Sequence, residues 1–133
     1  MTQEEKELLL KDLSARLPYK VHCRVFKLNG DIKENDDILY GVIGDNVVTL
    51  KSDKDECLMY YQIKPYLRPG STMTMEEQFQ LGKLLGAATY NLLKGEYSYL
   101  KELLEYSYKT HIDLFGLIPK GLALEAPEDM YNI

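Results

Sequence analysis

The chain has 133 residues, of which 45% are hydrophobic and 28% charged, as is typical of one globular domain spanning 1–133. Its formal net charge of -5 argues against a nucleic-acid partner, because phosphate contacts need a concentration of Lys and Arg. No apolar run approaches the roughly 20 residues of a membrane span, and the N-terminus lacks a secretory signal, so we expect a cytoplasmic protein with no membrane partner.

The first residues predict an amphipathic helix. Thr2 and Glu5 form a capping box, and leucines then recur at helical spacing, which predicts a helix over about 3–15. Pro18 follows and ends it. We expect the polar face of this helix, Asp12 included, to be solvated.

Alternating apolar residues and turn signals predict a small antiparallel sheet within about 21–64. The expected strands lie near 21–25, 38–43, 47–51 and 57–63. Asn29-Gly30 predicts a turn, but the polar run after it favours a loop over a buried strand. Three or four strands result, as a small sheet or a partly open barrel.

An irregular crossover is expected at about 65–74. Pro65 and Pro69 have no backbone N–H to donate, so a central strand should end there. Thr74 and Glu77 form a second capping box, which predicts the start of a helix.

The C-terminal half predicts two helices and an irregular tail. Apolar spacing places the helices at about 75–93 and 96–109 and leaves 110–133 irregular. Gly82 and Gly86 inside the first of them predict close approach of another element, or else a kink. The predicted fold class is therefore α+β, with an N-terminal helix, a small antiparallel sheet and two C-terminal helices.

Catalytic and metal-binding residue types occur without a recognisable arrangement. His22 and Cys23 are strand neighbours that point to opposite faces, and nothing brings Cys57 near His111. The His and Cys spacings match no zinc site, and the glycines match no nucleotide-binding motif. We therefore expect a non-enzymatic protein with no catalytic residue, cofactor or metal, in which both cysteines are buried thiols.

Several short sequence motifs occur in a characteristic order over nearly the whole chain. They are Asp12–Tyr19, Lys64–Pro69, His111–Asp113, Gly116–Ile118, Gly121–Pro127 and Met130–Tyr131. In these motifs the chain resembles a family of short uncharacterised proteins of gut Bacteroidetes and of their prophages and other mobile elements. The resemblance implies a small cytoplasmic accessory protein from or derived from a mobile element, and supplies no catalytic or binding residues. The chain departs from the family pattern at Lys20, where a glycine usually stands, and at Gly70, where a larger residue is usual.

Five residues are candidates for partner binding. Tyr66 and Arg68 lie two apart in a predicted extended segment, on one face, and exposed Tyr and Arg often anchor interfaces. Alternatively, Arg68 reaches back to a carboxylate or a helix carbonyl and fixes the crossover. Tyr97, Tyr99 and Tyr106 offer either core packing or a second contact surface. The leading interpretation is a protein-binding module that binds an unidentified protein or a second copy of itself.

A nucleic-acid-associated regulator that uses the small sheet is the alternative interpretation. Basic residues of the predicted strands could gather on one face despite the acidic composition. These residues are Lys20, Arg24, Lys27, Lys51 and Lys64.

Overall fold

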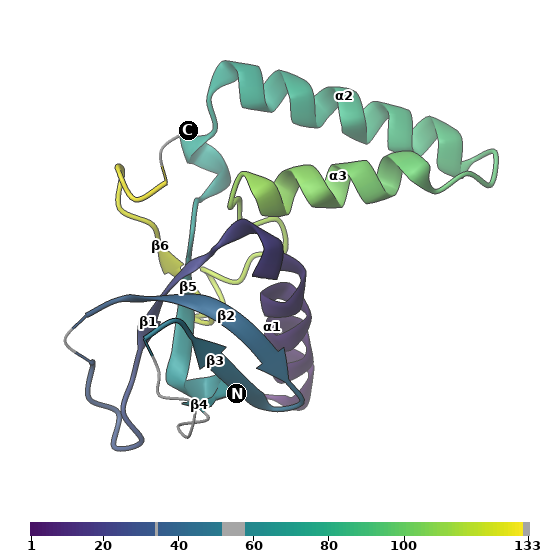
Figure 1. Cartoon of the computed structure of the whole chain (residues 1–133). Helices are drawn as coiled ribbons and strands as arrows, with labels where there is room; N and C mark the ends of the chain where they lie inside the picture. The colour runs from purple at the N-terminus through teal and green to yellow at the C-terminus, as the bar shows by residue number, and fades with distance from the viewer. Residues whose placement is uncertain (34, 52–57, 132–133) are drawn as a thin grey trace.

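The computed structural model describes residues 1–33, 35–51 and 58–131, and its fold is α+β (Figure 1). The helices are α1 (Gln3–Arg16), α2 (Met75–Leu92) and α3 (Ser98–Lys109). The strands are β1 (His22–Val25), β2 (Asp37–Ile43), β3 (Asn46–Thr49), β4 (Leu58–Met59), β5 (Ile63–Leu67) and β6 (Leu124–Glu125). Within the described ranges, no helix combines the length and the apolar character needed to cross a membrane.

The strands form one open mixed sheet in the order β4-β3-β2-β1-β5-β6. Neighbouring strands are antiparallel except β5 and β6, which are parallel. The prediction of three or four antiparallel strands is therefore wrong in number and in part in direction, since the described residues form six. The segment expected as one strand at 57–63 is divided, because a single 3-10 turn at Tyr60–Gln62 separates β4 from β5; Cys57 lies outside the described residues.

Pro65 lies inside β5, so the prediction that the strand ends there is wrong. The carbonyl of Leu67 accepts from Ala126 N at 2.8 Å, on the side of β5 where β6 lies. Residues two apart in a strand direct their backbone groups to the same side. The missing donor of Pro65 therefore faces the β6 side, one residue before that pairing begins at Tyr66. The crossover to α2 starts only after Leu67.

The main hydrophobic core lies between α1, the sheet and the segment after α3. It contains thirteen buried residues among those described: Leu9, Leu13, Val21, Cys23, Val25, Leu39, Val47, Leu58, Ile63, Leu67, Leu117, Leu122 and Ala123. The predicted helix at 3–15 is confirmed, with both hydrogen bonds of its capping box present. We call residues 1–74 and 110–131, as far as they are described, the body.

The two C-terminal helices form an antiparallel pair that we call the hairpin, residues 75–109 (Figure 1). Both helices begin and end within two residues of the predicted bounds. A small cluster of Leu84, Ala88 and Leu103 holds them together. α3 lies between α2 and the body, so α2 forms the outer edge of the molecule (Figure 1).

Candidate protein-binding surface

Arg68 ties the end of β5 to the start of α2. Its Nη1 donates to Glu77 Oε2 at 2.7 Å and its Nη2 to Glu77 Oε1 at 2.8 Å, a two-point pair between a planar guanidinium and a carboxylate. The same two nitrogens donate to the carbonyls of Thr110 and Thr72, each at 3.1 Å. Arg68 is only 9% exposed, so the expectation of an exposed side chain is wrong, and the geometry supports the alternative in which Arg68 fixes the crossover.

Glu77 serves two purposes at this position. It completes the capping box of α2, since Thr74 N donates to Glu77 Oε1 at 2.9 Å and Glu77 N donates to Thr74 Oγ1 at 3.1 Å. The hydrogen bonds from Arg68 lower the pKa of the Glu77 carboxyl to about 2. The carboxylate is therefore charged at neutral pH, and neither partner of the pair is free for another ligand.

Tyr66 is also buried, at 4% exposed, which contradicts the expected exposure of this side chain. Its hydroxyl donates to Asp36 Oδ1 at 3.0 Å and accepts from Arg24 Nε at 3.1 Å. Arg24 and Lys64 are cross-strand neighbours in β1 and β5. Asp36 thus adds a negative charge near Arg24, because both residues bind the Tyr66 hydroxyl.

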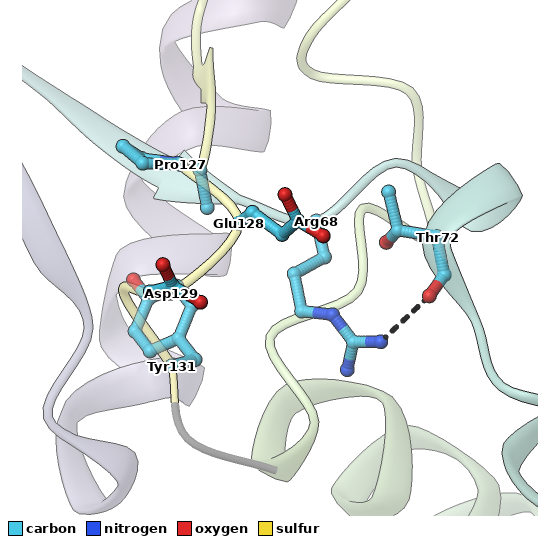
Figure 2. Close-up of a pocket in the computed structure, with 7 residues that line it drawn as sticks. Arg68, Thr72, Pro127, Glu128, Asp129 and Tyr131 are labelled. Carbon is cyan, nitrogen blue, oxygen red and sulfur yellow. Dashed lines mark hydrogen bonds between the residues drawn. The ribbon is translucent and has the colours of Figure 1, made fainter.

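A cleft of about 580 Å³ lies beside Arg68 (Figure 2). Arg68 and Thr72 line one side, and residues 126–129 with Tyr131 line the other. The guanidinium is paired with Glu77, and exposed Glu128 and Asp129 add negative charge at the rim. An anion would therefore meet no net positive charge in this cleft.

A buried junction that sequence reasoning missed joins the body to the hairpin. Arg16 Nε donates to Asp12 Oδ2 at 2.7 Å, and Arg16 Nη2 donates to the carbonyl of Ile112 at 2.9 Å. The guanidinium also lies 5.0 Å from the centre of the Tyr108 ring in α3. Asp12 is 2% exposed, so the prediction that it is solvated is wrong. The spacing of Leu9, Asp12 and Arg16 on one helical stripe was the signal that could have shown this.

His111 and Tyr131 pack against each other within the body, and His111 lies near enough to Arg16 for its charge to act on the imidazole. Their rings stack with centres 3.7 Å apart, and Tyr131 Oη donates to the carbonyl of Tyr66 at 2.7 Å. Burial, together with the charge of Arg16, lowers the pKa of His111 to about 4, so the imidazole is neutral at physiological pH. Both rings act as packing groups that hold the C-terminal segment against the sheet.

The described residues bring none of the tested chemical groups together as a catalytic or metal site. Cys23 is fully buried, and burial raises the pKa of its thiol to about 12, which makes it a poor nucleophile. The pairing of Cys57 with His111 lies outside the described residues. Among the described residues, no group of three or more His, Cys, Asp or Glu side chains is placed to hold a metal ion.

The three candidate tyrosines near α3 lie in different surroundings. Tyr97 is 68% exposed and precedes the first turn of α3, and Tyr99 is 39% exposed in that turn. Tyr106, about two turns further along the helix, is half-buried against the small cluster between α2 and α3. These residues therefore do not present three equivalent exposed rings.

Exposed apolar residues concentrate on the hairpin, and several of them lie on α2, which carries none of the predicted site residues. Eight of the sixteen exposed large hydrophobic residues fall between 75 and 99, which concentrates apolar surface on the hairpin. Met75, Phe79 and Leu93 are 86%, 74% and 84% exposed. The missed signal is that α2 carries large apolar residues, Met75 and Phe79, away from the side on which Leu84 and Ala88 pack against α3.

Three lysines line a smaller cleft of about 340 Å³ beside Val25 of β1 and Thr49 of β3. The lysines are Lys27, Lys33 and Lys51, and the buried residue Asp37 lines the same cleft. Lys51 Nζ donates to the carbonyl of Asp36 at 3.0 Å. Of the five basic residues in the nucleic-acid hypothesis, this cleft therefore contains two.

Comparisons with known proteins add no further constraint. No family model, no curated protein and no solved structure matches this chain.

Proposed function

We propose that the protein is a non-enzymatic protein-binding module whose binding surface is the outer face of α2. The observation that carries this proposal is the exposure of large apolar side chains near both ends of α2, away from the side that packs on α3 among the described residues. Met75, Phe79 and Leu93 are each more than 70% exposed. Large exposed apolar patches on soluble proteins mark interaction sites, because water contact with apolar surface is unfavourable.

The composition of the face supports the same function. Phe79 and Tyr90, 74% and 60% exposed, are aromatic residues of the kind that anchor interfaces. The origin in a mobile element and the cytoplasmic location belong to the proposal as well, and both rest on the sequence alone.

Affinity capture from cells that naturally produce the protein tests this function. The wild type, Phe79→Glu and Tyr40→Glu are each tagged and used as bait in nuclease-treated lysate. Tyr40 is a matched control because it is 69% exposed on β2, away from the hairpin. We expect the wild type and the control to retain the same stoichiometric protein, which is either a different protein or an untagged copy of the chain, and Phe79→Glu to lose it. Equal recovery by all three baits would contradict a binding role for α2.

A nucleic-acid-associated function is the second candidate, favoured by the position of Lys27, Lys33 and Lys51 around one cleft. Fluorescence anisotropy with labelled single-stranded DNA and RNA tests it at low and physiological salt. Binding that weakens with salt and with Lys27→Glu would support this function, since phosphate contacts are salt-dependent. Salt-independent binding, or no binding of DNA and RNA, would exclude this function.

A further inference from the structure

We infer that the outer face of α2 pairs with the same face of a second copy, in an antiparallel arrangement with two-fold symmetry. This inference rests on the proposed function and names its partner. The α2 stripe consists of Met75, Phe79, Gly82, Gly86, Thr89 and Leu93.

The α2 stripe has the spacing of a helix–helix seam. Its successive members are separated by four, three, four, three and four residues. This alternation repeats every seven residues and keeps one line of side chains facing a partner helix. Leu84 and Ala88, which face α3, lie on the other side of the helix. The seam is therefore additional to the contact that α2 already makes within the chain.

Gly82 and Gly86 have no packing role among the described residues. Apart from its chain neighbours and the adjacent backbone of α2 itself, a methyl group built on either glycine would meet no described atom within 4 Å. Glycine inside a helix is unfavourable compared with alanine, so both positions weaken α2 without allowing any described element of this chain to come close. The expected close approach therefore fits a helix from outside the chain.

The spacing of the residues in the α2 stripe is symmetric about position 84. Met75 and Leu93 are equally distant from this centre, and so are Gly82 and Gly86. In a two-fold interface a residue contacts a symmetry-related position and is contacted by it in return. An antiparallel pair centred here therefore places the two long apolar side chains together at each end and the glycines together in the middle.

The remaining pair of the stripe is also complementary in size. Phe79 would lie opposite Thr89 of the second copy, a large side chain against a small one. Thr89 Oγ1 donates to the carbonyl of Leu85 at 2.8 Å within its own helix. Covering Thr89 therefore leaves no hydroxyl without a partner.

The charges beside the stripe favour an antiparallel arrangement over a parallel one. Exposed Glu76 lies in the first turn of α2, and exposed Lys94 lies just past its end. Antiparallel pairing brings Glu76 of one copy near Lys94 of the other, whereas parallel pairing would bring like charges together. Glu77 takes no part, because Arg68 already binds it.

Sedimentation velocity of the purified full chain over about a hundredfold range of concentration tests the inference. We expect a concentration-dependent dimer that Phe79→Glu weakens at least about tenfold and that Tyr40→Glu leaves unchanged. A wild type that stays monomeric throughout, or a dimer insensitive to Phe79→Glu, would overturn the self-pairing.

Glycine replacement separates association from folding. Gly82→Ala with Gly86→Ala should raise the urea midpoint of the dilute chain, because alanine favours a helix, while weakening the dimer about tenfold or more. Gly70→Ala is the control, since its added methyl group also meets open space and Gly70 lies outside the α2 stripe. A double variant that dimerises as tightly as the wild type would overturn the central close approach.

Cysteine cross-linking tests the direction of pairing. Met75→Cys and Leu93→Cys are made separately in a Cys57→Ser background and then mixed under oxidising conditions. Antiparallel pairing predicts a 75–93 disulfide and no 75–75 disulfide, because the two 75 positions would lie about 27 Å apart. A dominant 75–75 product would overturn the antiparallel arrangement.

The outcomes distinguish this inference from the proposed function. A monomeric wild type whose captured protein still depends on Phe79 would overturn self-pairing and leave the binding module in place. Stripe variants that alter neither self-association nor capture would overturn both.

Discussion

The body and the hairpin differ in how completely this chain buries their apolar residues. The body encloses a cluster of thirteen buried hydrophobic residues between α1, the sheet and the C-terminal segment. The hairpin buries three, and its outer helix leaves Met75, Phe79 and Leu93 more than 70% exposed. The difference shows that the body buries most of its apolar core within its own chain, and it motivates our proposal that another surface covers the outer face of α2. Four predictions test this contrast, from the largest expected effect to the smallest.

Breaking the ion pair between the two regions should have the largest effect on stability. Arg68→Ala leaves the buried carboxylate of Glu77 without its partner, which should lower the free energy of unfolding by about 3–5 kcal/mol in urea titrations. Lys101→Ala is the matched control, because Lys101 and Glu105 form an exposed pair at 3.8 Å and the loss should be below about 1 kcal/mol. Equal losses for the two variants would mean that the Arg68 pair does not hold the regions together.

Equivalent cavities in the two cores should have unequal consequences. Leu13→Ala removes a fully buried side chain from the body and should cost about 3–5 kcal/mol of global stability. Leu103→Ala, at a 7% exposed position in the hairpin, should cost about 2–3 kcal/mol and open the hairpin before the body. Far-ultraviolet and near-ultraviolet circular dichroism during denaturation measure the separation. A single coincident transition for Leu103→Ala would show that the two regions unfold as one unit.

Acid should lower the stability of the chain in two steps. The pKa of His111 is about 4 in the folded chain, below its ordinary 6.5, so only the unfolded chain takes up this proton between these values, and stability falls as pH drops from 6.5 to 4. The loss is on the order of 2–3 kcal/mol. The pKa of Glu77 is lowered from 4.5 to about 2. Its contribution to the free energy of unfolding is therefore complete above pH 4.5 and is lost as the pH falls toward 2.

Urea midpoints measured from pH 7 to pH 3 follow both steps. His111→Asn should remove the step between pH 6.5 and 4 and keep the lower one, since asparagine does not titrate in this range and tolerates the positive φ of 63° at this position. A His111→Asn profile that matches the wild type would contradict the burial of a neutral imidazole.

The smallest effect is expected at a turn in the body. Lys20 has φ 53° and ψ 55°, a left-handed conformation that costs a non-glycine residue about 1–2 kcal/mol. Lys20→Gly should therefore raise the midpoint of thermal unfolding by a few degrees, with about 1 kcal/mol of added stability after the greater chain entropy of glycine is counted. A lower midpoint for Lys20→Gly would mean that the lysine side chain contributes packing here.

The sequence predicted those helices and turns whose signals lie within a few neighbouring residues. The Thr74–Glu77 capping box and regular apolar spacing place the start of α2, because all the groups involved lie within one or two turns. β6 was missed because it is two residues long and pairs with β5 from about 60 positions away, so no alternation marks it.

The candidate site shows the same limit. The sequence placed Tyr66 and Arg68 at an interface, but their partners Asp36 and Glu77 lie 30 and 9 positions away, and only the fold brings them close enough to occupy both side chains. Arg16 contacts Ile112 across 96 positions, a pairing that no local pattern encodes. The glycines at 82 and 86 predicted close approach of another element, but no described element of this chain comes close to either of them, so close approach of a second copy stays a proposal.

Hydrogen–deuterium exchange of the full chain at two concentrations tests the contrast between the regions most directly. In dilute solution, amides of α2 should exchange faster than those of α1, since α2 packs on the small core of the hairpin and α1 on the larger core of the body. At high concentration, exchange in α2 should slow while α1 stays unchanged, because a second copy stabilises only the helix that it covers. Exchange in α2 that is as slow as in α1 and independent of concentration would contradict the proposal that a partner covers α2.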